Sequence, residues 1–309
     1  EGTSKINFKS HVLYLGSCFS THMAEQSAYY QIPHTVNPFG IVFNPGALAI
    51  LIKRVANRKL FTKNEVLKRD GLFFCLEAGS AVFGTDLQAF INYLNNTLQL
   101  LYTSLTKSTH VIITLGTAWG FKHKNFNKLV ANCHKFPAED FQKQLLNVES
   151  IDDALAQLES DVKSINASAK IIYTVSPVRH TKEGLIQNAR SKAHLLAAVH
   201  QRVNAAQVSY FPAFEIMMDE LRDYRFYKSD LIHPNTQAIQ YIWELFSKTY
   251  LEPNMQPLLK EIEAIQKGLK HKPLQPQSVS YQEFKHKLSQ RIKSLQDKWP
   301  HISFPNSLA

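Results

Sequence analysis

Residues 230–234, DLIHP, combine an acid and an imidazole at a spacing that suits proton transfer. Asp230 and His233 lie three positions apart on a turn before a segment with helical periodicity. The carboxylate can therefore reach the ring, fix its tautomer and stabilise the imidazolium form. The alternative is that Asp230 caps the helix and His233 is an ordinary surface histidine. The first interpretation predicts a general base, which needs a nucleophile elsewhere in the chain.

The hydroxyl that such a base can activate is that of Ser17. Ser17 follows Gly16 at the end of the apolar run Val12–Leu15 and precedes a segment that can continue as a helix. The glycine permits a sharp turn, and the amino end of a helix stabilises negative charge. Taken alone, Ser17 would be interpreted as a helix cap, but a histidine base turns a serine into an effective nucleophile. The combination predicts a serine hydrolase that cleaves an ester or acyl group through an acyl-enzyme.

The cysteines offer a second, less favoured nucleophile. Cys18 follows Ser17 directly, and its thiolate would be more reactive than a hydroxyl. The Gly-Ser pair after the first strand nevertheless places the hydroxyl in register with the Asp-x-x-His turn, so we expect the serine to react. Together with Cys75 and Cys133, this residue forms neither a disulfide framework nor a C-x-x-C pair, which favours a reducing compartment.

Strands alternate with helices along the chain. The runs Val12–Leu15, Val111–Leu115 and Ile171–Val175 are apolar and β-branched, as in buried parallel strands. We also expect a strand at Val208–Phe214, short strands in an insertion at Phe61–Thr85, and helices at Phe19–Ala28, Asp86–Leu101, Asp140–Ile165, Gln187–Ala206, Glu215–Arg222 and Pro234–Tyr250. This alternation predicts an α/β fold with a mainly parallel sheet and helices on both faces. Reactive groups of such a sheet gather at the carboxyl ends of its strands.

Composition favours one main globular core and argues against several classes of partner. The chain has 309 residues, 44% of them hydrophobic and 19% charged, and no apolar run approaches the roughly 20 residues that span a bilayer. Residues 1–11 lack the pattern of a signal peptide, which favours the cytoplasm. The formal net charge of +10 is dispersed, without the aromatic interleaving of a single-strand binding surface, so neither nucleic acid nor a membrane is an expected partner.

Several motifs follow one another along the chain. They are GSCFS at 16–20, NPFGIVFNP at 37–45, LGTAW at 115–119, NCHK at 132–135, SPVRH at 176–180, RDYRFY at 222–227 and DLIHP at 230–234. In this order they resemble the motifs of the GSCFA-domain family, within the SGNH (GDSL-like) hydrolase superfamily. The family takes its name from the first motif, in which Ser20 stands where the name has alanine. The similarity spans nearly the whole core, from Leu13 to Phe246.

The resemblance implies a flavodoxin-like, three-layer α/β/α sandwich with Ser17 as nucleophile, His233 as general base and Asp230 as its orienting acid. We expect residues 1–250 to form this SGNH-like hydrolase domain. Residues 251–309, where prolines punctuate Lys- and Gln-rich helical segments, should form a basic helical C-terminal extension packed on the core.

The third SGNH motif departs from its usual form. Enzymes of the superfamily bind the oxyanion with the amide of the serine, the amide of a glycine in the second motif and an asparagine in Gly-x-Asn-Asp. Gly40 fits the second role, but Ala118 stands where the asparagine would be. Losing one such donor typically costs about a hundred- to a thousandfold in rate. Asn132 is the first substitute, with His134 and the Thr117 hydroxyl as alternatives. The other interpretation of Asn132 is a loop amide that satisfies backbone groups.

Other residues of these motifs have two interpretations each. Trp119 and Phe39 could form apolar walls for an acyl or sugar group, or belong to the core. His180 follows a strand end and could line the pocket, or be solvated. Asn37 and Asn44, each before a proline, are candidates for contacts or for turn residues.

We expect the substrate to be a small acyl ester, with an acetyl group on a carbohydrate as the hypothesis drawn from the superfamily. An acyltransferase with the same triad and a catalytically weak binding module on the same fold are the alternatives. No cofactor is expected. No metal is expected either, since His110, His123 and His134 show no tight spacing with acids.

Overall fold

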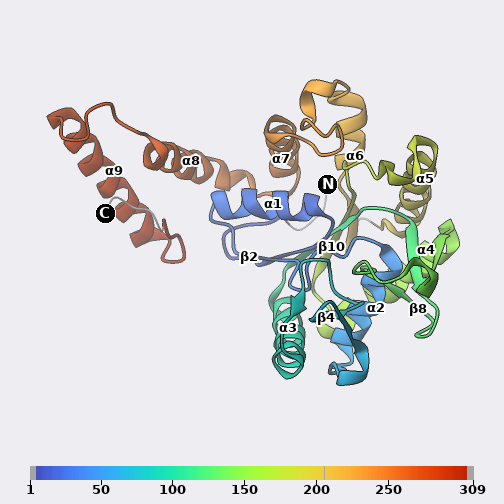
Figure 1. Ribbon diagram of the computed structural model, residues 1–309. Helices are drawn as coiled ribbons and strands as arrows, with labels where there is room; N and C mark the ends of the chain where they lie inside the picture. Colours follow the sequence, from blue (N-terminus) through green and yellow to red (C-terminus); the bar gives the residue numbers. More distant parts are fainter. Residues whose placement is uncertain (1–4, 205, 305–309) are drawn as a thin grey trace.

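Five parallel strands form the central sheet of the computed structural model, which describes residues 5–204 and 206–304 (Figure 1). The strands are ordered β2-β1-β6-β10-β11 across the sheet. This is the flavodoxin-like order, and its topological switch point lies between β1 and β6. The predicted α/β fold is confirmed. The strands are β1 (Val12–Gly16), β2 (His34–Val36), β6 (His110–Leu115), β10 (Lys170–Val175) and β11 (Val208–Tyr210).

Helices cover both faces of this sheet, which gives three layers (Figure 1). Alternate residues of β1 show the two sides, because Leu13 and Leu15 join one apolar cluster while Val12 and Tyr14 join the other. The first cluster contains residues of α2 (Pro45–Ala56), α3 (Leu87–Lys107), α4 (Val148–Ile165) and α5 (Leu185–Arg202). The second contains residues of α1 (Cys18–Tyr29), α7 (Thr236–Tyr250), α8 (Gln256–Lys270) and α9 (Val279–Lys298).

Two small antiparallel sheets interrupt this alternation. The insertion predicted at Phe61–Thr85 contains β3 (Val66–Arg69), β4 (Leu72–Cys75) and β5 (Phe83–Gly84), as expected. A second small sheet, which the sequence patterns did not predict, consists of β7 (Trp119–His123), β8 (Lys128–Val130) and β9 (Phe141–Leu145).

The prediction of a helix over Asp140–Ile165 is wrong for its first part. Strand β9 occupies those residues and pairs with β7, with Trp119 opposite Leu145. The helix starts only after Asn147, whose side chain caps α4 by accepting a hydrogen bond from the Ser150 amide at 2.9 Å. Pairing with β7 therefore overrides the helical spacing of the apolar residues.

The remaining elements lie close to their predicted positions, with a few differences. The predicted strand Val208–Phe214 ends at Tyr210, and Glu215–Arg222 contains a π-helical turn at Ile216–Glu220. The predicted helix Gln187–Ala206 is observed as α5, while its residue Ala205 lies outside the described residues. Strand β2 and helix α2 were not predicted.

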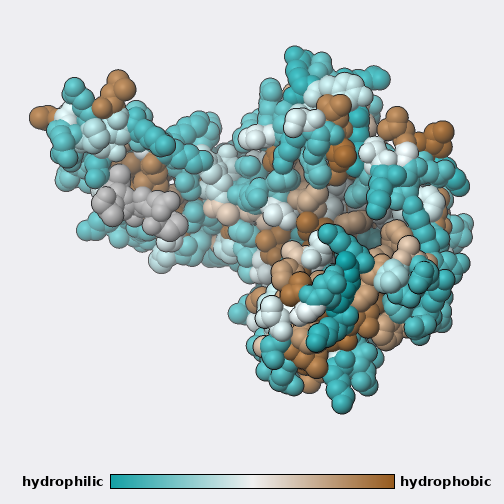
Figure 2. All heavy atoms as spheres, viewed as in Figure 1, coloured by the Kyte–Doolittle hydropathy of each residue, from teal (hydrophilic) through white to brown (hydrophobic). Residues whose placement is uncertain are grey.

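The C-terminal helices α8 and α9 lie beyond α1 (Figure 1). Leu259, Ile262 and Ile265 of α8 are buried in the same cluster as α1, and Gln266 donates a hydrogen bond to the Tyr29 carbonyl at 3.2 Å. Their surface is mainly hydrophilic in the view of Figure 2. Residues 1–4 of the predicted domain and 305–309 of the predicted extension lie outside the described residues. Within the described chain, no helix has the length and apolarity needed to cross a membrane.

Strand β1 ends at a glycine that the packing requires. Gly16 has a φ of 122°, and a Cβ atom there would lie 2.1 Å from the Thr114 carbonyl oxygen. We predict that Gly16→Ala lowers the free energy of unfolding by about 3 kcal/mol or more, because the backbones of β1 and β6 must separate. Gly71→Ala is the matched control, since Gly71 also has a positive φ, of 78°, but nothing within 4 Å of the added atom.

Urea unfolding of the two variants separates the steric effect from the conformational one. Gly71→Ala should cost only about 1 kcal/mol for its backbone conformation. Equal losses in the two variants would show that contact with β6 does not limit position 16.

Candidate active site

Ser17 lies at the switch point, between the end of β1 and the start of α1. Its amide donates to the Thr114 carbonyl at 3.0 Å, and its Oγ accepts from the Phe19 amide at 3.2 Å, which makes it the N-cap of α1. The Asn37 side chain accepts from the Gly16 amide at 2.9 Å. The hydroxyl is thus held rigidly at the carboxyl edge of the sheet, and the residue is 1% exposed.

The neighbouring thiol is less suited to reaction. Burial raises the pKa of Cys18, against smaller opposing effects that include the charges of Lys228 and Lys192. The thiol form is therefore favoured over the thiolate, which is the reactive form. This supports the hydroxyl of Ser17 as the better candidate.

Asp230 and His233 are joined in the way that their spacing predicts. One carboxylate oxygen of Asp230 accepts from the amides of Ile232 and His233 at 2.8 and 3.0 Å, and the other lies 2.7 Å from Nδ1 of His233. The two amides, together with the imidazole, hold the pKa of the Asp230 carboxyl well below its usual range. A carboxylate that stays ionised fixes the ring and leaves Nε2 as the nitrogen available for proton transfer.

The turn that carries this pair is clamped to the loop after β10. The Arg179 amide donates to the Ile232 carbonyl at 3.2 Å, and the Arg179 guanidinium lies 4.4 Å from the centre of the Tyr227 ring. Leu231 has a φ of 56°, a conformation that a branched side chain rarely adopts. The turn is therefore held in a strained shape by its neighbours.

Within the described residues, no hydrogen bond joins Ser17 to His233. The three triad candidates do come from elements at the same edge of the sheet, because Ser17 ends β1 and the turn of His233 is clamped to the loop after β10. Catalytic hydrogen bonds often tighten only when substrate is bound.

The two backbone amides predicted as oxyanion donors, those of Ser17 and Gly40, are already engaged in hydrogen bonds. The amide of Ser17 is bonded to Thr114, as described above, and the amide of Gly40 donates to the Asn37 carbonyl at 2.8 Å. Ser191 on α5 accepts from the amide of Ala118 at 2.8 Å. The hydroxyls of Ser191 and Thr117 are also 2.8 Å apart. Thr117 and Ala118 of the third motif thus form hydrogen bonds with α5.

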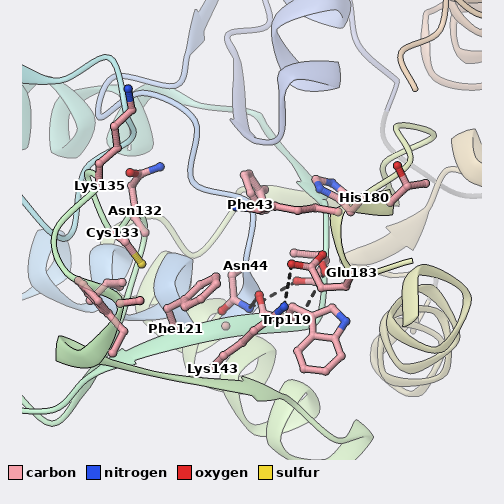
Figure 3. A pocket seen from close by; sticks show the side chains of 18 of the residues that line it. Phe43, Asn44, Trp119, Phe121, Asn132, Cys133, Lys135, Lys143, His180 and Glu183 are labelled. Carbon is pink, nitrogen blue, oxygen red and sulfur yellow. Dashed lines mark hydrogen bonds and ion pairs between the residues drawn. The ribbon is translucent and has the colours of Figure 1, made fainter. Parts of the chain in front are cut away.

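A cavity of about 740 Å³ lies among the residues drawn in Figure 3. Its lining includes Ile232, which belongs to the Asp230–His233 turn. Five candidate residues line the cavity, namely Asn44, Thr117, Trp119, Asn132 and His180. Gly40 and the triad candidates are not among its lining residues.

Asn132 and His134, both predicted as binding residues, have different hydrogen-bond partners and different positions relative to the cavity. The side-chain oxygen of Asn132 accepts from the His134 amide at 2.7 Å, while Asn132 itself lines the cavity. His134 lies outside the cavity, where its Nε2 is 2.9 Å from the Cys75 carbonyl and its ring packs 5.0 Å from that of Phe74. Asn132 therefore lies in the wall of the cavity, while His134 packs against β4 and has a structural role.

The two asparagines of the second motif are turn residues. Asn37, with a φ of 39°, accepts from Gly16 as described above. Asn44 caps α2 by accepting from the Ala47 amide at 3.2 Å, and it donates to the Trp119 carbonyl at 3.1 Å. Both therefore hold the loops around the site.

Sequence reasoning missed a buried lysine. Lys192 of α5 is 2% exposed, and its ammonium group donates to the carbonyls of Gly116 at 2.8 Å and Ser176 at 2.7 Å, where β6 and β10 end. The signal was present, because Lys192 shares the buried face of α5 with Leu195 and Val199, and a charged residue there is unusual. Burial lowers the pKa of Lys192 to about 7.

No group of three or more His, Cys, Asp or Glu residues in the described chain is arranged to hold a metal ion. Catalysis by a Ser-His-Asp arrangement needs none.

The parallel five-stranded sheet, with Ser17 at its switch point and the Asp230–His233 pair on a separate turn, defines an α/β protein with helices on both faces of the sheet. The chain belongs to the GSCFA family, whose model matches residues 11–246. A second model, described as the GSCFA domain protein C-terminal domain, matches residues 262–309. No curated protein sequence matches the chain.

Two solved structures are similar over most of the chain. One is described as an acetyl esterase mutant with an acetate ion, with 12% identity, a TM-score of 0.37 and coverage of 82% of this chain and 99% of that one. The other is a carbohydrate esterase family 3 protein from Talaromyces cellulolyticus, with 11% identity, a TM-score of 0.36 and the same coverage.

The low pKa of Lys192 predicts a pH dependence of stability. The unfolded chain, where lysine has its ordinary pKa of 10.5, binds a proton that the folded chain releases above about pH 7. The free energy of unfolding should therefore rise with pH between these values, by up to about 1.4 kcal/mol per pH unit from this group. Lys192→Met should lack this rise.

Urea unfolding from neutral to alkaline pH tests this, with the exposed Lys53→Met as control. The prediction would be contradicted if the free energies of unfolding of the wild type and of Lys192→Met changed with pH in parallel.

Proposed function

We propose that the protein is a serine esterase in which Ser17 is the nucleophile, His233 the general base and Asp230 the residue that orients the base. The main support for this proposal is the set of contacts made by the Asp230 carboxylate. It accepts hydrogen bonds from two backbone amides and lies next to Nδ1 of His233, at distances of 2.7–3.0 Å. Such a carboxylate fixes one tautomer of the histidine and favours its protonated form during the reaction.

The reaction follows from these roles. The Ser17 hydroxyl attacks the ester carbonyl while Nε2 of His233 takes its proton, and the resulting tetrahedral intermediate expels the alcohol, which receives that proton. Water then attacks the acyl-enzyme with His233 again as base, which releases the carboxylic acid and restores the serine. The positive amino end of α1 stabilises the negative charge that develops on the carbonyl oxygen of the ester bound at Ser17.

A short acyl group on a carbohydrate is the proposed substrate. Ser17 is 1% exposed, which favours a small group such as acetyl at the reacting position. The cavity that includes Ile232 of the catalytic turn, about 740 Å³ in volume with Trp119 and Phe121 on its walls, has room for the rest of a sugar.

A binding module on the same fold is the second candidate. The engaged amides of Ser17 and Gly40, and alanine at position 118 in place of the oxyanion asparagine, favour it, because an oxyanion needs free hydrogen-bond donors. The two candidates differ in turnover and not in the ability to bind a sugar.

Hydrolysis of a panel of short-chain acyl esters tests the proposal. Ser17→Ala and His233→Gln should each lower kcat by about 10⁴-fold or more, and Asp230→Asn by a smaller factor. Cys18→Ala, adjacent in sequence, should keep most of the activity and serves as the matched control.

Each variant must first show a wild-type circular dichroism spectrum. Loss of turnover in Cys18→Ala with retention in Ser17→Ala would assign the reaction to the thiol. No turnover by the wild type on any ester, combined with binding of an acetylated sugar, would favour the binding module. Diversion of product to an added alcohol would identify an acyltransferase.

A further inference from the structure

The cavity beside the triad has an excess of positive charge. Its lining includes the four cationic residues Lys135, Lys143, Arg179 and Lys182, and one carboxylate, Glu183. In the chain as a whole the ratio is much closer to even, with 35 Lys and Arg against 25 Asp and Glu. The proportion of cationic residues is therefore higher in the cavity lining than in the chain as a whole.

The single carboxylate is already neutralised. Glu183 accepts from Nζ of Lys143 at 2.8 Å, as Figure 3 shows at the lower side of the cavity. Lys135 and Lys182 are exposed, and no ion pair is found for either among the described residues. Arg179 likewise has no carboxylate partner there, and its guanidinium rests on Tyr227. Up to three cationic residues of the lining are thus without a carboxylate partner in the described chain.

Neutral polar groups add to this arrangement. Nε2 of His180 is buried and has no hydrogen-bond partner, although a polar atom in such a place ordinarily has one. Burial and the charges of Lys192 and His233 lower the pKa of His180 to about 3, so the ring is neutral at physiological pH. Asn132 lies across the cavity from His180 (Figure 3).

The walls suit a flat, partly apolar ring. Trp119 and Phe121 of β7 line the cavity, and Lys143 lies 4.8 Å from the centre of the Trp119 ring. Aromatic faces beside charged and amide groups match a sugar, which has apolar C–H faces and polar edges.

We propose that the cavity binds an anionic sugar residue, one that carries a carboxylate or a phosphate, and that the esterase therefore acts on acylated acidic glycans. This inference rests on the proposed function for the ester and on the cavity for the anion. Lys182 and Lys135 attract the anion, and His180 and Asn132 form hydrogen bonds with the sugar. The scissile ester lies toward Ile232 and the catalytic turn.

The experiment compares three acetylated oligosaccharides of equal length, which are neutral, uronate-containing and phosphorylated, with 4-nitrophenyl acetate as a substrate without a sugar. The wild type should show a kcat/KM about tenfold or more higher for at least one acidic ester than for the neutral one, mainly through KM. Added salt should reduce this preference, because screening weakens attraction between exposed charges. The uronate and phosphate arms identify which anion is preferred.

Single substitutions then locate the preference. Lys182→Gln and Lys135→Gln should each reduce the ratio of acidic to neutral kcat/KM by about fivefold, the effect of one partly exposed charge pair. Lys124→Gln is the matched control, since Lys124 is an exposed lysine near the same small sheet but does not line the cavity. Equal kcat/KM for acidic and neutral esters, or a preference that all three variants share, would overturn the proposal.

Calorimetric binding to the Ser17→Ala protein separates this inference from the proposed function. If no ester is hydrolysed but the acidic oligosaccharide binds more tightly than the neutral one, the anion site stands and the esterase does not. If the neutral ester is hydrolysed but the acidic oligosaccharide binds no more tightly than the neutral one, the esterase stands and the anion site does not.

Discussion

The close approach of β1 and β6 at the carboxyl edge of the sheet is the constraint on which the site depends. The Thr114 carbonyl occupies the space that a side chain at position 16 would need, so the chain can turn there only as glycine. The same carbonyl accepts the Ser17 amide at 3.0 Å, and Asn37 holds the Gly16 amide from the other side. The position of the serine hydroxyl is therefore fixed by backbone contacts between strands, which resist change better than a loop does.

Helix α5 organises the opposite side of the crevice. Ser191 holds the loop after β6, and the Lys192 ammonium joins the ends of β6 and β10 through two carbonyls. A lysine buried this completely is costly, because desolvation disfavours its charged form. The cost is offset by hydrogen bonds to carbonyls that would otherwise be unsatisfied. The loop that precedes Trp119 and the loop that carries His180 are thus positioned by one helix, and both residues line the cavity.

Sequence patterns predicted the parallel core well, because buried strands such as Val111–Leu115 are continuous apolar runs that few other structures share. The same patterns failed to predict strands whose formation depends on hydrogen bonding to a neighbouring strand. Strand β9 has helical apolar spacing but pairs with β7, and β2 is only three residues long. The Asp230–His233 contact could be predicted, since three residues of spacing define a local turn. The roles of Ser191 and Lys192 could not be predicted from the sequence, because they depend on which helix packs against the loop of the third motif.

The central claim, that Ser17 is activated by His233, is tested most directly by a phosphonate reagent that reacts only with an activated serine. Our account predicts one adduct per chain, located on Ser17 by peptide mapping, and strongly slowed labelling in the His233→Gln protein. Labelling on another residue, or an unreactive Ser17 in a folded wild-type protein, would contradict it.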